Sequence, residues 1–145
     1  NLRQAVAGLH KFADVTRVSS IYETRPKYVE DQPQFLNMVV VGTTNLPALD
    51  LLAQLKNLET SLGRTFSKRY GPRKIDLDII FYGDDRIELP DLTIPHPGLE
   101  EREFVLRPLA DIAPEKSHPV SGKTIRELLD ALNGEDVLNC FVSAC

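Results

Sequence analysis

The sequence has few of the features that would set it apart from ordinary globular proteins. Its two cysteines, Cys140 and Cys145, are too few and too close together for a disulfide framework, so we expect a reducing compartment. We interpret both as ordinary thiols, because a structural zinc site usually needs four ligands. No apolar run approaches the roughly 18 residues of a membrane-spanning helix, and the chain contains neither an internal repeat nor a low-complexity stretch.

An excess of positive charge is also missing. The formal net charge is -4 at pH 7, so nothing global indicates a nucleic-acid or membrane partner. The first residue is Asn and not Met, and we therefore expect an N-terminus that has been trimmed or processed. We expect a cytoplasmic protein, or an organellar one if a targeting segment was removed.

The features that are present fit a single globular domain over residues 1–145. Hydrophobic residues make up 42% of the chain and charged residues 26%, which are ordinary values for a soluble protein. A chain of this length can bury a sizeable core without disulfides or metals.

Basic residues are concentrated in one stretch of this acidic chain. Between Lys56 and Lys74 six residues are basic and only Glu59 is acidic, a local net charge of +5. The basic residues are Lys56, Arg64, Lys68, Arg69, Arg73 and Lys74. The stretch is either an anion-binding patch or a solvated basic loop, and the choice depends on what lies beside it.

Hydrophobic spacing divides the chain into helical and extended segments. It predicts helices at 2–12, 51–62 and 123–132, strands at 15–23, 35–44 and 74–82, and a brief extended piece at 104–107. Gly63 is a natural stop for the second helix, and a proline-rich loop runs through His96 and Pro97. This order is a split βαβ pattern without its first strand. We therefore predict an α+β fold, a ferredoxin-like split βαβ sandwich with helices packed on a mainly antiparallel sheet.

The predicted strand at 74–82 alternates apolar and charged residues. Asp76 and Asp78 then point the same way, with Cα atoms about 6.6–6.8 Å apart. Carboxylates this close favour a cation between them, and Mg²⁺ binds through one or two carboxylates together with phosphate oxygens and water. Such ions bridge phosphates in phosphoryl transfer. Taken alone, the pair is equally well explained by acids that face water.

A turn and an arginine come directly before the two aspartates. Gly71 and Pro72 fix the turn, and Arg73 leaves it toward the charged face of the predicted strand. Arginine grips phosphate with two parallel hydrogen bonds. Together with the basic stretch, this arrangement favours a Mg²⁺–phosphate site over a solvated surface.

The sequence from Gly71 to Ile80 resembles the signature of a known enzyme family. That family is 6-hydroxymethyl-7,8-dihydropterin pyrophosphokinase of folate biosynthesis. Further segments at 31–37, 62–64, 92–97 and 102–109 are similar to the family as well, and the resemblance covers at least residues 1–114. It implies an enzyme that transfers pyrophosphate from ATP to the hydroxymethyl group of the pterin and leaves AMP.

The resemblance also implies roles for individual residues. The expected catalytic residues are Arg64, Arg73, Asp76 and Asp78, and the two aspartates would bind two Mg²⁺ ions. The expected pterin-binding residues are Thr24, Phe35, Asn37 and Phe104. The expected ATP-binding residues are Lys56, Glu59, Arg64, Arg73, Ile79, Thr93, His96 and Arg102. The resemblance further implies fusion to, or joint action with, other folate-pathway enzymes.

The chemistry of these residues is consistent with a pterin site. Two aromatic rings form a stacking slot for a flat heterocycle, and an amide offers a donor and an acceptor to its edge. Without the resemblance, Phe35 and Phe104 are explained by core packing and His96 is an ordinary loop histidine. Asn37 is unusual in an apolar strand, because a buried amide needs partners.

The chain departs from the family at its start. The family's N-terminal strand and the glycine-rich loop after it are absent, and losing a central strand would expose its neighbours. The segment 137–142 is strand-like and is a candidate to replace it. Two other functions stay open: a different Mg²⁺-dependent nucleotidyl- or glycosyl-transferase with an Asp-x-Asp motif, and an inactive interaction domain of the same fold.

Overall fold

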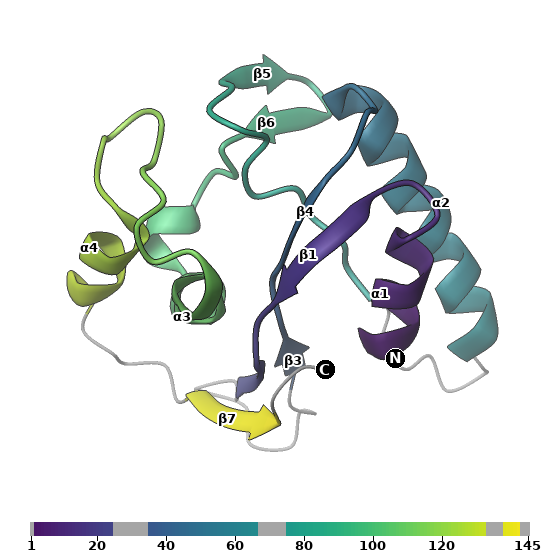
Figure 1. Ribbon diagram of the computed structural model, residues 1–145, viewed down its shortest axis with the longest axis horizontal. Helices are drawn as coiled ribbons and strands as arrows, with labels where there is room; N and C mark the ends of the chain where they lie inside the picture. The colour runs from purple at the N-terminus through teal and green to yellow at the C-terminus, as the bar shows by residue number, and fades with distance from the viewer. Residues whose placement is uncertain (1, 25–34, 67–74, 133–137, 143–145) are drawn as a thin grey trace.

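The computed structural model describes residues 2–24, 35–66, 75–132 and 138–142 (Figure 1). In chain order the elements are α1 (Leu2–Leu9), β1 (Asp14–Val18), β2 (Ile21–Thr24), β3 (Phe35–Asn37), β4 (Val40–Thr43), α2 (Ala48–Phe66), β5 (Ile87–Leu89), β6 (Leu92–Ile94), the 3₁₀ helix η1 (Leu99–Glu101), α3 (Glu103–Ile112), α4 (Ile125–Asp130) and β7 (Leu138–Val142). All the strand pairs among these elements are antiparallel. The prediction of an α+β fold class is therefore confirmed. No helix in the described ranges is both long and apolar enough to cross a membrane.

The two predicted strands at 15–23 and 35–44 each break into two shorter strands. β1 pairs with β4, and β2 pairs with β3, so the chain forms one antiparallel ribbon with a bend in its middle. Ser19 lies at the bend and is buried. Its hydroxyl accepts from the Val39 N–H at 2.9 Å and donates to the Ser20 carbonyl at 2.8 Å. The side chain thus provides hydrogen bonds where the regular ladder stops.

The segment 138–142 is extended, as its sequence predicts. It forms β7, which pairs with β2 in the register Ile21↔Val142 to Thr24↔Leu138. The sheet order β3-β2-β7 places it on the opposite edge of β2 from β3. Residue 137, the first of the predicted segment, lies outside the described residues.

Two apolar clusters form the core. The first cluster joins α1, α2 and β6 through Leu9, Leu55 and Ile94. The predicted helix at 51–62 is confirmed, but its predicted stop is wrong, because α2 continues through Gly63 to Phe66. A single glycine inside a helix costs only about 1 kcal/mol relative to alanine, which a helix packed in the core can tolerate.

The second cluster joins η1, α3 and α4 through buried leucines and Ile125. The prediction of an extended piece at 104–107 is wrong, since these residues lie inside α3. Leu106, Leu109 and Ile112 are buried at helical spacing, and this apolar face was hidden at sequence level by Pro108 within the helix. The predicted last helix is confirmed as α4.

In Figure 1, α1 and α2 lie on one side of the β1–β4 pair, and α3 and α4 on the other.

The predicted strand at 74–82 is not found as a strand. Residues 75–81 pair with none of the described strands, and residue 74 lies outside the described residues. From Ile75 to Ile79 the side chains keep the predicted alternation of exposure. Leu77 and Ile79 belong to the first cluster, and Ile80 and Phe81 to the second. This stretch, which we call the carboxylate segment (residues 75–81), therefore connects the two halves of the core.

The β5–β6 hairpin lies in the stretch that the sequence predicts as a proline-rich loop. Leu89 and Leu92 pair across a two-residue turn. In β6 the side chains of Leu92 and Ile94 are buried and that of Thr93 is exposed. The hairpin thus contributes Ile87, Leu92 and Ile94 to the first cluster and leaves Thr93, a predicted ATP contact, at the surface.

Candidate functional site

Asp76 and Asp78 are both exposed on the carboxylate segment. Their neighbours Ile75 and Leu77 are half-buried and Ile79 is buried, so the two carboxylates leave the same side, as the alternation predicts. Neither makes an ion pair with another described residue. Two accessible carboxylates suit Mg²⁺, which needs one or two of them when phosphate oxygens complete its shell. Among the described residues, no group of three or more His, Cys, Asp or Glu is arranged around a possible metal.

The carboxylate segment is attached to α2 between the two aspartates. The Leu77 N–H donates to Glu59 Oε2 at 2.5 Å, and Glu59 Oε1 lies 3.4 Å from Lys56 Nζ. Two predicted ATP-binding residues, Lys56 and Glu59, are thereby brought beside the predicted metal ligands. The anchoring role of Glu59 was missed at sequence level, where the available signal was that it is the one acid in a basic stretch.

The loop after β6 meets the same segment a little further along. The His96 N–H donates to the Ile80 carbonyl at 3.0 Å. The Nδ1 atom of His96 is buried and has no hydrogen-bond partner among the described residues. A buried polar atom of this kind normally has a partner, so a ligand or water is the natural candidate to supply one.

Arg102 and Phe104 lie at the start of α3, near the second cluster. The Arg102 guanidinium carbon is 5.8 Å from the centre of the Phe104 ring, and Arg102 is exposed while Phe104 is half-buried. A cation–π contact at an exposed position contributes about 0.5–1 kcal/mol. The contact therefore contributes only weakly to the position of either side chain.

The pterin-side elements are also close to one another. α3, which carries Phe104, contacts both β2 and β3, and β3 carries Phe35 and Asn37. The Tyr22 hydroxyl joins β2 to α3 by hydrogen bonds of 2.9 and 3.1 Å to the Asp111 carboxylate. Asn37 is half-buried and lies opposite Tyr22 in the β2–β3 ladder.

Some predicted site residues cannot be placed as side chains. Arg73 lies outside the described residues, and the side chains of Thr24, Phe35 and Arg64 do so as well. The side chain of Ile79 is 8% exposed and packs in the first cluster, so it does not face solvent with the aspartates.

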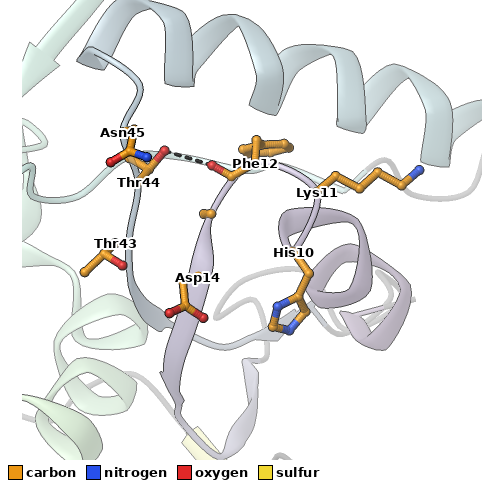
Figure 2. A pocket seen from close by; sticks show the side chains of 8 residues that line it. His10, Lys11, Phe12, Asp14, Thr43, Thr44 and Asn45 are labelled. Carbon is orange, nitrogen blue, oxygen red and sulfur yellow. Dashed lines mark hydrogen bonds between the residues drawn. The ribbon is translucent and has the colours of Figure 1, made fainter.

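A hollow of about 300 Å³ lies elsewhere, where β1 begins and β4 ends (Figure 2). His10, Lys11, Asp14, Thr43 and Asn45 contribute to its lining. Thr44 Oγ1 donates to the Phe12 carbonyl at 2.8 Å across it. None of the residues predicted to bind ATP, pterin or metal lines this hollow, and we assign it no role in the site.

Known proteins are similar to this chain over most of its length. The family model described as 7,8-dihydro-6-hydroxymethylpterin-pyrophosphokinase matches residues 1–114. The 2-amino-4-hydroxy-6-hydroxymethyldihydropteridine pyrophosphokinase of Bacillus subtilis is 49% identical over 129 residues, which are 87% of this chain and 77% of that protein. The pyrophosphokinase of the same name from Synechocystis is 43% identical over 135 residues, 92% of this chain and 69% of that protein.

Longer relatives contain a similar region. The mitochondrial folate synthesis bifunctional protein of Pisum sativum is 50% identical over 106 residues, 73% of this chain and 20% of that protein. The chain thus spans about a fifth of that relative's length. The matched residues 1–114 include the carboxylate segment, the α2 residue Glu59 that binds its Leu77 N–H, and the start of α3. This chain belongs to the 7,8-dihydro-6-hydroxymethylpterin-pyrophosphokinase family.

Proposed function

We propose that this protein transfers pyrophosphate from ATP to the hydroxymethyl group of 6-hydroxymethyl-7,8-dihydropterin, with release of AMP, in folate biosynthesis. Membership of the pyrophosphokinase family makes ATP the co-substrate. The observation that carries the proposal is the pair of exposed carboxylates, Asp76 and Asp78, held around an anchored amide on the carboxylate segment. The acidic pair and the basic stretch before it provide the two kinds of group that a polyphosphate site needs.

Asp76 and Asp78 are the residues that we propose to hold two Mg²⁺ ions. When bound, Mg²⁺ neutralises charge on the phosphates and orients the reacting groups. The donor set fits, since both side chains are carboxylates with access to solvent. The exposed position leaves room for the phosphate oxygens and waters that complete an octahedral shell.

The remaining roles follow the family resemblance. Arg64 and Arg73 would clamp the transferred phosphates, and the resemblance implies contacts to ATP for six further residues, with Arg102 at the phosphates. These six are Lys56, Glu59, Ile79, Thr93, His96 and Arg102. The buried Nδ1 atom of His96 supports this assignment, because a bound nucleotide would give it a partner. For Ile79, whose side chain is in the core, a contact would have to involve the backbone.

For the pterin we propose a slot between Phe35 and Phe104, with Asn37 and Thr24 at the edge of the ring. The contact between α3 and β3 supports this slot, because it puts the two elements that carry the aromatic residues next to each other. The same arrangement of ribbon and flanking helices is consistent with a ferredoxin-like sandwich formed by a single domain over residues 1–145.

The relatives suggest where such an enzyme acts. One is named as a mitochondrial bifunctional folate synthesis protein. By extension, we propose that this protein works with, or is fused to, other folate-pathway enzymes, in the cytoplasm or in an organelle.

An assay of AMP release tests the proposal. The protein is incubated with ATP, Mg²⁺ and the hydroxymethyl-dihydropterin, and AMP and the pterin pyrophosphate are both quantified. We expect the two products in equal amounts, and none without the pterin. Transfer to a different acceptor would favour another Asp-x-Asp transferase, and a folded protein that forms no AMP would favour an interaction domain.

A further inference from the structure

The Glu59 carboxylate already has partners within the chain. Its Oε2 atom accepts from the Leu77 N–H at 2.5 Å, and its Oε1 atom lies 3.4 Å from Lys56 Nζ. The side chain is only 18% exposed, whereas that of Lys56 is 54% exposed. Both carboxylate oxygens of Glu59 are therefore engaged within the chain, and one of them holds a backbone amide.

The amide that Glu59 holds lies midway between Asp76 and Asp78. Leu77 is fixed at two points, because its side chain packs in the first cluster while its N–H is bound by Glu59. The flanking aspartates are exposed and make no contact of this kind with described residues. A rotation of the backbone at Leu77 would swing both carboxylates, so an anchored amide at this point fixes the direction of both.

No neighbouring strand supplies this restraint. The carboxylate segment pairs with none of the strands in the described ranges. Further along the segment, the Ile80 carbonyl accepts a hydrogen bond from the His96 N–H. An extended segment in a sheet is normally held by its ladder. At Leu77, a charge-assisted hydrogen bond to the carboxylate of Glu59 on α2 restrains the backbone instead.

We propose that Glu59 is a positioning residue, which orients Asp76 and Asp78 for metal binding by holding the Leu77 N–H between them. This inference rests on the function proposed above, and it gives Glu59 a role other than the direct ATP contact implied by the family. Within the described residues Glu59 does not complete a three-ligand group with the aspartates. It therefore acts through the backbone, and its own negative charge is partly offset by Lys56, whose Nζ atom lies 3.4 Å from Glu59 Oε1.

Amide hydrogen exchange on the full chain tests the anchor without metal or substrate. In the unsubstituted protein we expect the Leu77 amide to exchange slowly. A hydrogen bond to a charged group shifts an equilibrium by about one to two orders of magnitude, so Glu59→Ala should speed exchange at Leu77 by about tenfold or more. Glu59→Gln keeps an oxygen acceptor and should give an intermediate rate. The control is Asn57→Ala, an exposed position on the same helix, which should leave the rate unchanged.

Kinetics then separate positioning from direct ATP binding. For a positioning residue, Glu59→Ala raises the Mg²⁺ concentration for half-maximal activity by about tenfold and lowers kcat, and Glu59→Gln restores a large part of both. If Glu59 instead contacts ATP directly through its charge, both variants raise the KM for ATP to the same extent. The exchange rate of the Leu77 amide then stays unchanged. That second pattern would overturn the inference and leave the proposed reaction intact. An inactive unsubstituted protein in which Leu77 still responds to Glu59→Ala would instead count against the proposed reaction.

Discussion

At the scale of single residues, the proposed site depends on two exposed carboxylates around one anchored amide. If Asp78 holds a metal ion, its removal takes away charge stabilisation of several kcal/mol in the transition state. We expect Asp78→Ala to lower kcat by about a hundredfold or more, measured as AMP release at saturating ATP and pterin.

The matched control for this variant is Asp91→Ala. Asp91 is also an exposed aspartate, but it lies in the turn of the β5–β6 hairpin, outside the proposed site. It should keep the activity of the unsubstituted protein, which shows that the effect of Asp78→Ala is not a general loss of surface charge. Near-normal turnover of Asp78→Ala would refute the proposed metal site.

The residue scale also shows what a sequence can reveal about a site. The shared direction of Asp76 and Asp78 was predictable, because side chains alternate over two residues whether or not the segment joins a sheet. The bond from Glu59 to Leu77 was not, because it joins residues 18 positions apart through the packing of α2 against the segment. Charge composition marked Glu59 as unusual but could not say what it touches.

At the scale of elements, the β1–β4 pair depends on a glycine. A Cβ atom at Gly42 would lie 2.6 Å from the Asp14 carbonyl oxygen, which is backbone and cannot move aside easily. We expect Gly42→Ala to lower the free energy of unfolding by about 1–3 kcal/mol, measured by urea denaturation. Gly63→Ala is the matched control, because a Cβ there meets nothing within 4 Å. In the interior of α2 it should instead stabilise by about 0.5–1 kcal/mol.

The start of α4 carries a pH-dependent restraint. Thr124 and Glu127 form a capping box, in which the Thr124 N–H donates to Glu127 Oε1 at 2.8 Å and the Glu127 N–H donates to Thr124 Oγ1 at 3.1 Å. The bond from the Thr124 N–H, followed by that from its side chain, lowers the pKa of Glu127 below its ordinary value of 4.5. The stability gained from this shift is therefore complete above that value and is lost as the pH falls through the lowered pKa.

The comparison with Glu127→Gln measures this contribution. We expect the difference in unfolding free energy between the unsubstituted protein and Glu127→Gln to be constant near neutral pH and to shrink below about pH 4.5. Urea denaturation at several pH values provides the measurement. A difference that stays the same down to pH 3 would mean that the charge of Glu127 contributes nothing to the cap.

Element predictions succeeded where the pattern was local. Leucines at helical spacing predicted α2, and α4 was predicted near its observed position. The strand at 74–82 failed because a strand needs a partner, which alternation within one segment cannot specify. α3 was missed because Pro108 and the neighbouring Val105 suggest extended structure, and the β5–β6 hairpin because its turn, Pro90-Asp91, lacks the glycine of a typical two-residue turn.

At the scale of the whole molecule, two clusters share one connecting segment. Leu106 is fully buried in the second cluster, so Leu106→Ala leaves a cavity as well as losing apolar burial. We expect it to lower the free energy of unfolding by about 2–5 kcal/mol, followed by urea denaturation. Val120→Ala is the control, because Val120 is 60% exposed and should change the stability by less than about 0.5 kcal/mol.

The position of the carboxylate segment between the clusters has a consequence for nascent and damaged molecules. Leu77 and Ile79 need the first cluster, and Ile80 and Phe81 need the second, so the segment takes its shape only when both halves are folded. If Asp76 and Asp78 bind the metal ion as we propose, a half-folded chain offers no nucleotide site. Nucleotide binding itself would then select the completely folded form from a mixed population.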